Sequence, residues 1–382
     1  IKGGIGRLNN YMDVSATGKL TARATGSIYI YEVAGNMNLV LAVSNTGDVY
    51  LKAKGSILDS NGTNEADVIG NNIILESTQG GIGTSNNFLD INSAQSKSGR
   101  VDAAATGSIY LYETAGNLSI GLISSTAGDV YLSARGSIVD NNNNDMPNVV
   151  GRNLNLVAMG GIGTLGNFLD IRSAVSGAGK VDASAPSGIY LYQMAGNLAA
   201  GVIISSSGDV HLKARQSILD YNRTDAANVI GNNITFEAMD GGIGEVDNYL
   251  DISARAVLKA TARGSIHIYE VAGVMNLDVV VSATGDVYFR AAGSILDYGN
   301  TQSANVIGNN ITLVAIRGGI GSSNNYLDID SSFSAGGRVD VQSSMGVYLR
   351  EVSGDMAIGL IQSPRDVHLM GVGGIRSAQG QN

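Results

Sequence analysis

One thirteen-residue string, written four times, constrains the fold of this chain more than any other feature. It reads GDVYLKAKGSILD at 47–59 and returns with few changes at 128–140, 208–220 and 285–297. The string GGIG also recurs, at intervals of 77, 80, 81 and 77 residues, beginning at Gly3, Gly80, Gly160, Gly241 and Gly318. Self-similarity at a fixed period is typical of a repeat protein, in which each unit buries its apolar face against its neighbours.

A finer period runs inside these copies. An apolar residue that follows Gly-Ser, Gly-Gly or a similar pair marks fifteen places, which cover 370 residues in 14 steps of about 26 residues. The marked residues are Ile5, Ile28, Ile57, Ile82, Ile109, Ile138, Ile162, Ile189, Ile218, Ile243, Ile266, Ile295, Ile320, Val347 and Ile375.

Between the marks, apolar residues alternate with more polar ones. The segment VYLKA at 49–53 shows this alternation, and MNLVL at 37–41 is expected to turn Met37, Leu39 and Leu41 inward. A period of two with one polar face indicates strands that are buried on one side only. Gly, Asn, Ser and Asp between the strands supply the tight turns.

These periods predict an all-β fold, a right-handed parallel β-helix of about 14 coils of ~26 residues with three coils per ~78-residue super-repeat. Each coil is expected to hold about three strands. Residues 1–382 read as one continuous β-helix, a fragment of a longer repeat protein, with super-repeats at approximately 3–79, 80–159, 160–240, 241–317 and 318–382. A string of antiparallel β-sandwiches is the alternative, but it leaves the 26-residue period unexplained.

Charge and hydropathy exclude two classes of partner. The formal net charge is −9 and the pI is about 4.8, and no basic run occurs that would bind phosphate groups. Apolar stretches of only a few residues predict no membrane insertion of this segment. We therefore expect neither a nucleic-acid partner nor a membrane span.

Histidines and carboxylates are the candidates for catalysis or metal binding. His211 and His368 fall where other copies have tyrosine after Asp-Val, and His267 replaces the tyrosine of GSIY, so all three are interpreted as outward-facing surface residues. A calcium site or the carboxylate pair of a polysaccharide lyase would need residues that converge at one place. The recurring aspartates are interpreted as turn residues instead: Asp48, Asp129, Asp209, Asp286 and Asp366, and Asp59, Asp140, Asp220 and Asp297. No catalytic residue, metal site or cofactor is predicted.

Two further side-chain types recur with the period. Asn87, Asn167, Asn248 and Asn325 precede an aromatic residue and Leu-Asp, and a turn-bonding role is expected for them. Recurring tyrosines are the one candidate binding feature, because exposed aromatic rows hold sugars or pack against a second filament. We expect one exposed aromatic face made by Tyr29, Tyr31, Tyr110, Tyr112, Tyr190, Tyr192 and Tyr348.

The strings NLNLVAMGGIGTLGNFLDI (153–171), NNITFEAMDGGIGEVDNYLDI (232–252) and GSIYLYETAGNL (107–118) carry a family resemblance. They resemble the repeat region of filamentous-haemagglutinin-like secreted exoproteins, the adhesins exported by two-partner secretion. The resemblance implies an extracellular rod on the bacterial cell surface that serves attachment, aggregation or biofilm. The amino-terminal secretion domain of that family and an Arg-Gly-Asp triplet are missing from this sequence.

That resemblance and the periodicity together predict a structural stalk rather than an enzyme. Its expected partners are copies of itself, end to end or side by side, and host or matrix glycans and proteins. Two alternatives stay open: a glycan-binding β-helix that uses the tyrosine face, and a β-helical polysaccharide lyase or hydrolase.

Overall fold

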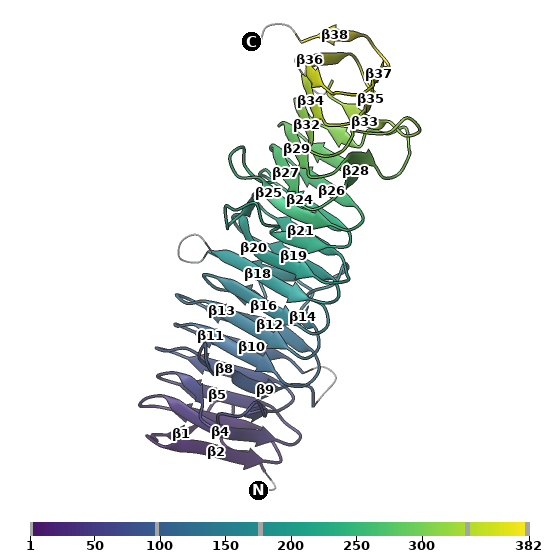
Figure 1. Cartoon of the computed structure of the whole chain (residues 1–382). Coiled ribbons are helices and arrows are strands. Elements are labelled where there is room, and N and C mark those ends of the chain that lie inside the picture. Colours follow the sequence, from purple (N-terminus) through teal and green to yellow (C-terminus); the bar gives the residue numbers. More distant parts are fainter. Residues whose placement is uncertain (1–2, 96–98, 175–178, 333–336, 379–382) are drawn as a thin grey trace. The chain divides into compact units, whose positions relative to one another are not determined.

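The computed structural model describes residues 3–95, 99–174, 179–332 and 337–378, which form strands, bridges, turns and bends but no helix (Figure 1). They divide into two compact units, Ile1–Met194 and Ala195–Asn382. Each unit is a parallel β-solenoid, and together the units hold about 17 turns. The predicted all-β parallel solenoid is therefore confirmed.

In unit 1 the chain alternates between two parallel sheets. Sheet I contains β1 (Met12–Val14), β3 (Ile28–Glu32), β5 (Val49–Ala53), β8 (Ile73–Ser77), β10 (Val101–Ala105), β12 (Leu118–Ser125), β14 (Ile138–Asp140), β15 (Val149–Val150), β17 (Leu169–Arg172) and β19 (Ile189–Gln193). Sheet II contains β2 (Lys19–Ala24), β4 (Met37–Ser44), β6 (Ile57–Asp59), β7 (Val68–Ile69), β9 (Leu89–Asn92), β11 (Ile109–Glu113), β13 (Val130–Ala134), β16 (Leu154–Ala158) and β18 (Lys180–Ala185).

Unit 2 is built in the same way from two sheets. One contains β21 (Val210–Ala214), β24 (Ile234–Ala238), β26 (Leu258–Ala262), β28 (Met275–Ser282), β30 (Ile295–Asp297), β31 (Val306–Ile307), β33 (Leu327–Asp330), β35 (Val347–Glu351) and β37 (Val367–Gly371). The other contains β20 (Leu198–Ser205), β22 (Ile218–Asp220), β23 (Val229–Gly231), β25 (Leu250–Ala254), β27 (Ile266–Glu270), β29 (Val287–Ala291), β32 (Ile311–Ala315), β34 (Val339–Ser343), β36 (Met356–Gln362) and β38 (Ile375–Ser377).

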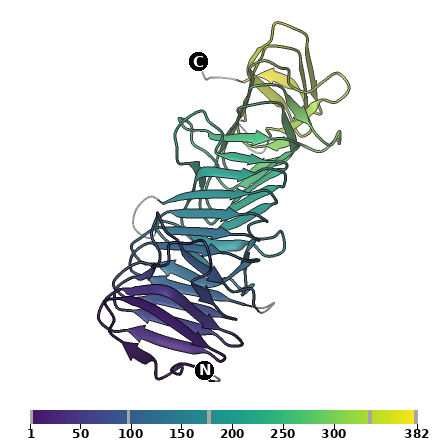
Figure 2. The same ribbon diagram turned by 60° about the horizontal axis from the view of Figure 1, so that its bottom comes forward.

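The core of each unit consists of stacked rows of aliphatic side chains. In sheet I the row Ile28, Val49, Ile73 and Val101 runs through four consecutive strands in register, and all four side chains are fully buried. Figure 2 shows these strands stacked as a ladder at the purple end of the chain. Burying each such side chain stabilises the fold by about 1.5–3 kcal/mol, so stability accumulates from turn to turn.

The fifteen marked residues are not one turn apart throughout, which corrects the predicted count of 14 coils. Ile82 bridges Ile57 on one side and Ile109 on the other, so these steps are single turns. Ile109, however, pairs with Val130, whereas Ile138 pairs with Leu118 in the other sheet. The step from Ile109 to Ile138 therefore spans one and a half turns. Because the prediction counted each step as one turn, it gave 14 turns where the structure has about 17.

Consecutive copies of GGIG consequently lie on opposite sheets. Ile82 joins the ladder of sheet II through Ile57 and Ile109, and Ile162 joins the ladder of sheet I through Ile138 and Ile189. In unit 2 the same alternation separates Ile243 from Ile320. Residues that are equivalent in the sequence repeat thus face opposite sides of the solenoid.

Each turn contributes to two sheets, so the expected three strands occur only in turns where one sheet receives two short strands, as sheet I receives β14 and β15 after β13. A long strand such as β12 pairs with two short ones, β14 through Leu118 and β15 through Ile123. A bulge in the middle of the long strand makes this possible. In β4 the bulge turns Ala42 into the core and leaves Leu41 half-buried, contrary to the alternation expected for Met37, Leu39 and Leu41.

Candidate functional site

The recurring tyrosines do not form one face. Tyr29 and Tyr31 lie on β3 of sheet I, whereas Tyr110 and Tyr112 lie on β11 of sheet II. This happens because successive copies of the repeat are offset by half a turn. The same offset places Tyr190 and Tyr192 back on sheet I, on β19. The predicted single aromatic face is therefore replaced by patches on both sheets: Tyr29, Tyr31, Tyr190 and Tyr192 on sheet I, Tyr110 and Tyr112 on sheet II, and Tyr348 on β35 of unit 2.

Several of these rings stack on the next turn. The ring centroids of Tyr29 and Tyr50 are 4.4 Å apart, and those of Tyr110 and Tyr131 are 4.6 Å apart, with nearly parallel planes in both pairs. In-register parallel strands about 4.8 Å apart bring equivalent rings to this distance. Tyr29 and Tyr110 thus use one face of the ring for packing against the tyrosine of the next turn.

The histidines occupy the expected places but differ in environment. His368 is exposed and stacks on Tyr348, and His211 is half-buried with its Nε2 2.7 Å from a Glu237 oxygen. The prediction of a surface residue is wrong for His267, which is 5% exposed and stacks on Tyr288 at 4.5 Å. Burial lowers the pKa of His267, so its neutral ring behaves as a packing residue.

The turn aspartates and asparagines bond across turns. Asp48 Oδ1 accepts hydrogen bonds from the backbone N–H and the side-chain amide of Asn72, at 3.1 and 3.0 Å. Asn87 donates its side-chain amide to the Asp59 carbonyl 28 residues earlier, at 3.3 Å. Both bonds reach residues 24 and 28 positions away, so these side chains tie one turn to the next rather than close a local turn.

A buried aspartate that recurs in the repeat was not predicted from the sequence. The aspartate of the LDI string lies between two inward-pointing residues, and alternation places it on the outer face. Its side chain is nevertheless covered, with exposed fractions of 4, 8, 4 and 0% at Asp90, Asp170, Asp251 and Asp328. The available signal was that an aspartate returns in every full copy of the aromatic-LDI string.

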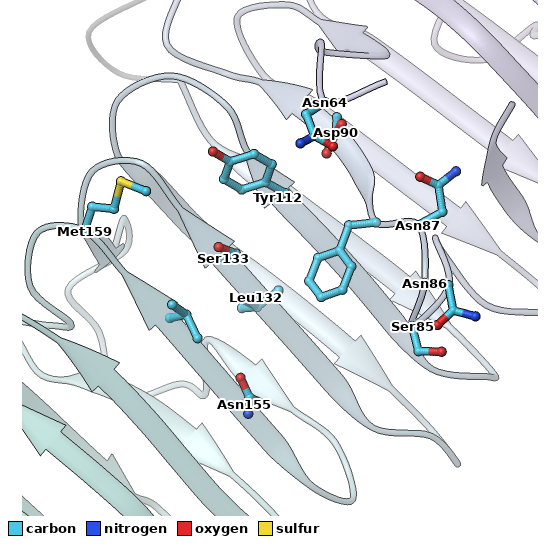
Figure 3. Close-up of a pocket in the computed structure, with 12 residues that line it drawn as sticks. Asn64, Ser85, Asn86, Asn87, Asp90, Tyr112, Leu132, Ser133, Asn155 and Met159 are labelled. Carbon is cyan, nitrogen blue, oxygen red and sulfur yellow. The ribbon is translucent and has the colours of Figure 1, made fainter. Parts of the chain in front are cut away.

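In unit 1 one of these carboxylates lines a cavity of about 400 Å³ (Figure 3). Four consecutive turns of sheet II build its floor, because Asp90 is in register with Tyr112, Tyr112 with Ser133, and Ser133 with Val157. Figure 3 shows Tyr112 and Ser133 on neighbouring strands, with Asp90 beyond Tyr112. The remaining lining residues are Asn64, Ser85, Asn86, Asn87, Phe88, Leu132, Asn155 and Met159.

The Asp90 carboxylate has no hydrogen-bond or ion-pair partner among the described residues, although its side chain is almost wholly buried. Burial, together with the neighbouring Asp59, raises the pKa of Asp90 to about 6. Asp67 lies behind it and accepts the Asp90 backbone N–H at 3.1 Å. Burial raises the pKa of Asp67 to about 8, so Asp90 carries the negative charge of this site at neutral pH.

Other copies of the same site are occupied by a basic side chain of the chain itself. Asp328 is fully buried and receives Arg350 as a forked ion pair, with Nε 2.6 Å from Oδ1. A smaller cavity contains Asp251 and Arg290, and the Arg290 guanidinium lies 4.6 Å from the ring centroid of Tyr269. The repeat thus offers a carboxylate and an aromatic ring to a guanidinium group.

A second set of buried acidic residues is found at the last position of strands that carry the tyrosines. Glu113 accepts hydrogen bonds from the Ser93 N–H at 3.0 Å and from the Ser93 hydroxyl at 2.6 Å, and Glu351 is held in the same way by Ser331. Burial raises the pKa of both glutamates to about 7. Gln193 takes the equivalent place on β19, which indicates that a neutral side chain fits there.

Within the described ranges no three His, Cys, Asp or Glu residues gather as they would around a metal ion. The same ranges contain no helix long and apolar enough to cross a membrane. No protein-family model, curated protein sequence or solved structure matches the chain.

Proposed function

We propose that this chain is a structural stalk segment of a secreted or surface-attached bacterial adhesin-like exoprotein, serving attachment, aggregation, biofilm or extracellular fibre formation. One observation supports the proposal above all: in each unit the described buried rows continue from turn to turn, up to the exposed strands β37 and β38. The winding is proposed to be right-handed, as parallel crossovers are.

A stalk needs stability along its length more than it needs a reactive centre. The row Ile57, Ile82 and Ile109 is fully buried across three turns, and further rows extend alongside it. Because each turn is held by both neighbours, local opening exposes two apolar faces at once and is costly. Such a segment resists proteolysis and carries other domains, and copies of the chain or host and matrix glycans and proteins are its proposed partners.

Localisation and attachment of cells test this function. Antibodies raised against the folded chain should label the surface of intact cells that encode it, and cells lacking the coding region should attach less to abiotic or host surfaces. Restoring the gene should restore attachment. Labelling only after cell lysis, with unchanged attachment in the deletion strain, would contradict the proposal.

Glycan binding along the tyrosine rows is the second candidate, and Tyr31 and Tyr112 are the residues that favour it, because both are half-buried on outer faces beside the stacked rows. Replacing both Tyr31 and Tyr112 by Ser should then abolish retention on a glycan array. Unchanged retention would remove this candidate.

A further inference from the structure

We propose that the cavity around Asp90 binds the guanidinium group of an arginine side chain presented by a protein partner. The buried carboxylate of Asp90 lines the cavity and has no partner among the described residues. Burial withdraws the Asp90 residue from most of its water contact while its carboxylate faces the cavity, and a bidentate guanidinium pairs with a carboxylate more effectively than any other side chain.

The chain itself shows what such a site accepts. Asp328 holds Arg350, which stands where the Asp90 copy of the site has Tyr112. Arg350 thus pairs with Asp328 from within the chain, whereas no side chain among the described residues pairs with Asp90.

Position 133 distinguishes this cavity from the smaller one around Asp251. The tyrosine of this repeat is paired in register with a basic residue in two other copies, Tyr31 with Lys52 and Tyr269 with Arg290. Lys52 Nζ lies 5.5 Å from the Tyr31 ring centroid, and Arg290 lies closer to its tyrosine. In the copy at Tyr112 the partner is Ser133, whose short side chain places no cation over the ring, and Arg135 Nε donates to the Tyr112 hydroxyl at 3.2 Å from the side.

The remaining lining suits a donor-only group. Asn86 and Asn155 offer amide oxygens and Tyr112 offers an aromatic face, while a guanidinium supplies five donors and no acceptor. A divalent cation is disfavoured because, among the residues that the structure describes, Asp90 is the only carboxylate that lines the cavity. The net charge of −9 also attracts a basic partner.

A residue within a peptide fits better than free arginine. Beyond Ser133 the cavity continues to Val157 and Met159, which are 42% and 67% exposed. This apolar rim offers contact area to a hydrophobic neighbour of the arginine, which a free amino acid lacks. The occupant is therefore an arginine with an adjacent apolar residue.

Calorimetric titration of the full chain at pH 7.5 with acetyl-arginyl-leucinamide tests the site. The isosteric acetyl-citrullinyl-leucinamide, which is neutral, should bind at least about tenfold more weakly, because it loses the charge-assisted pair. Free arginine should bind more weakly than the arginyl peptide. Equal binding of the arginine and citrulline peptides, or no binding of either, would overturn the proposal.

Three variants localise the binding. Asp90→Asn should abolish it, and Ser133→Arg should block it by placing a guanidinium over Tyr112, as Arg290 lies over Tyr269. Asp13→Asn is the matched control, because Asp13 is in register with Tyr31 at the same repeat position but is exposed. Thermal unfolding checks that each variant is folded.

Peptide binding that survives in folded Ser133→Arg would contradict the assignment. So would retention of oligosaccharides that depends on Asp90 when no peptide binds, because the cavity would then be a glycan site. Neither outcome bears on the stalk function.

Discussion

Asp67 occupies a place that asparagine takes in three other copies, at Asn148, Asn228 and Asn305. Asn148 donates its amide to Asp140 Oδ1 at 2.6 Å. Asp67 instead faces the equivalent Asp59, whose Oδ2 is buried without a partner, and burial raises the pKa of Asp67 to about 8. A carboxylate therefore stands where the fold favours an amide.

Replacing Asp67 by Asn should stabilise unit 1 by about 1–2 kcal/mol at pH 8, because the new amide hydrogen-bonds to Asp59 and removes a buried charge. Urea unfolding at pH 8 measures the change. The reciprocal variant, Asn148→Asp, is the control and should lose a similar amount. A less stable Asp67→Asn protein would show that the carboxylate contributes something the amide does not.

At the scale of the element, two of the bulged long strands, β12 and β36, have an ion pair that lies over a glycine. In β12 the bulge exposes the Leu122 N–H, which donates to Asp102 Oδ1 at 2.8 Å, and Arg100 holds Asp102 through Nε at 2.7 Å. A Cβ added to Gly121 would lie 2.0 Å from Arg100 Nε. Gly359 has the same surroundings in β36.

We expect Gly121→Val to lower the free energy of unfolding by about 1–3 kcal/mol, because it displaces the ion pair and leaves the Leu122 N–H without its acceptor. Chemical denaturation measures the loss. Gly166→Val is the matched control, since a Cβ at Gly166 meets no atom within 4 Å and should cost much less. Equal losses in the two variants would show that backbone entropy, rather than this contact, sets the cost.

At the scale of the molecule, sequence-equivalent positions in unit 1 should lie on opposite faces. The chain has no cysteine, so pairs introduced for spin labels react cleanly. Labels at Ser85 and Val157, which line one cavity, should give a shorter distance than labels at Ser85 and Leu165, which share a place in the repeat. Pulsed electron paramagnetic resonance measures both distances, and the reverse order would contradict the half-turn offset.

Buried acids should also make the whole chain less stable as pH rises. Burial raises the pKa to about 6 for Asp90, to about 7 for Glu113, Asp251 and Glu351, and to about 8 for Asp67. Unfolded carboxyl groups titrate near pH 4, so the folded chain binds more protons between about pH 4 and 8. Stability present below pH 4 is therefore lost as pH rises through these values.

Denaturation at pH 5 and pH 8 should show a fall of about 2 kcal/mol or more. The double variant Glu113→Gln, Glu351→Gln should show a smaller fall, because Gln193 already demonstrates that a neutral side chain fits. A wild-type protein that is more stable at pH 8 than at pH 5 would mean that these acids are ionised at little cost.

The strands, most inward rows and the parallel stacking can be predicted from the amino-acid sequence, because alternation of side chains is a local property of an extended backbone and the repeat copies it from turn to turn. Which rows share a sheet emerges only in the folded chain, since it depends on the number of residues in each corner and bulge. The tertiary structure also decided that Asp90 is buried and unpaired. That outcome depends on the length of the side chain at position 133, one turn beyond Tyr112, and no pattern along the chain encodes this contact.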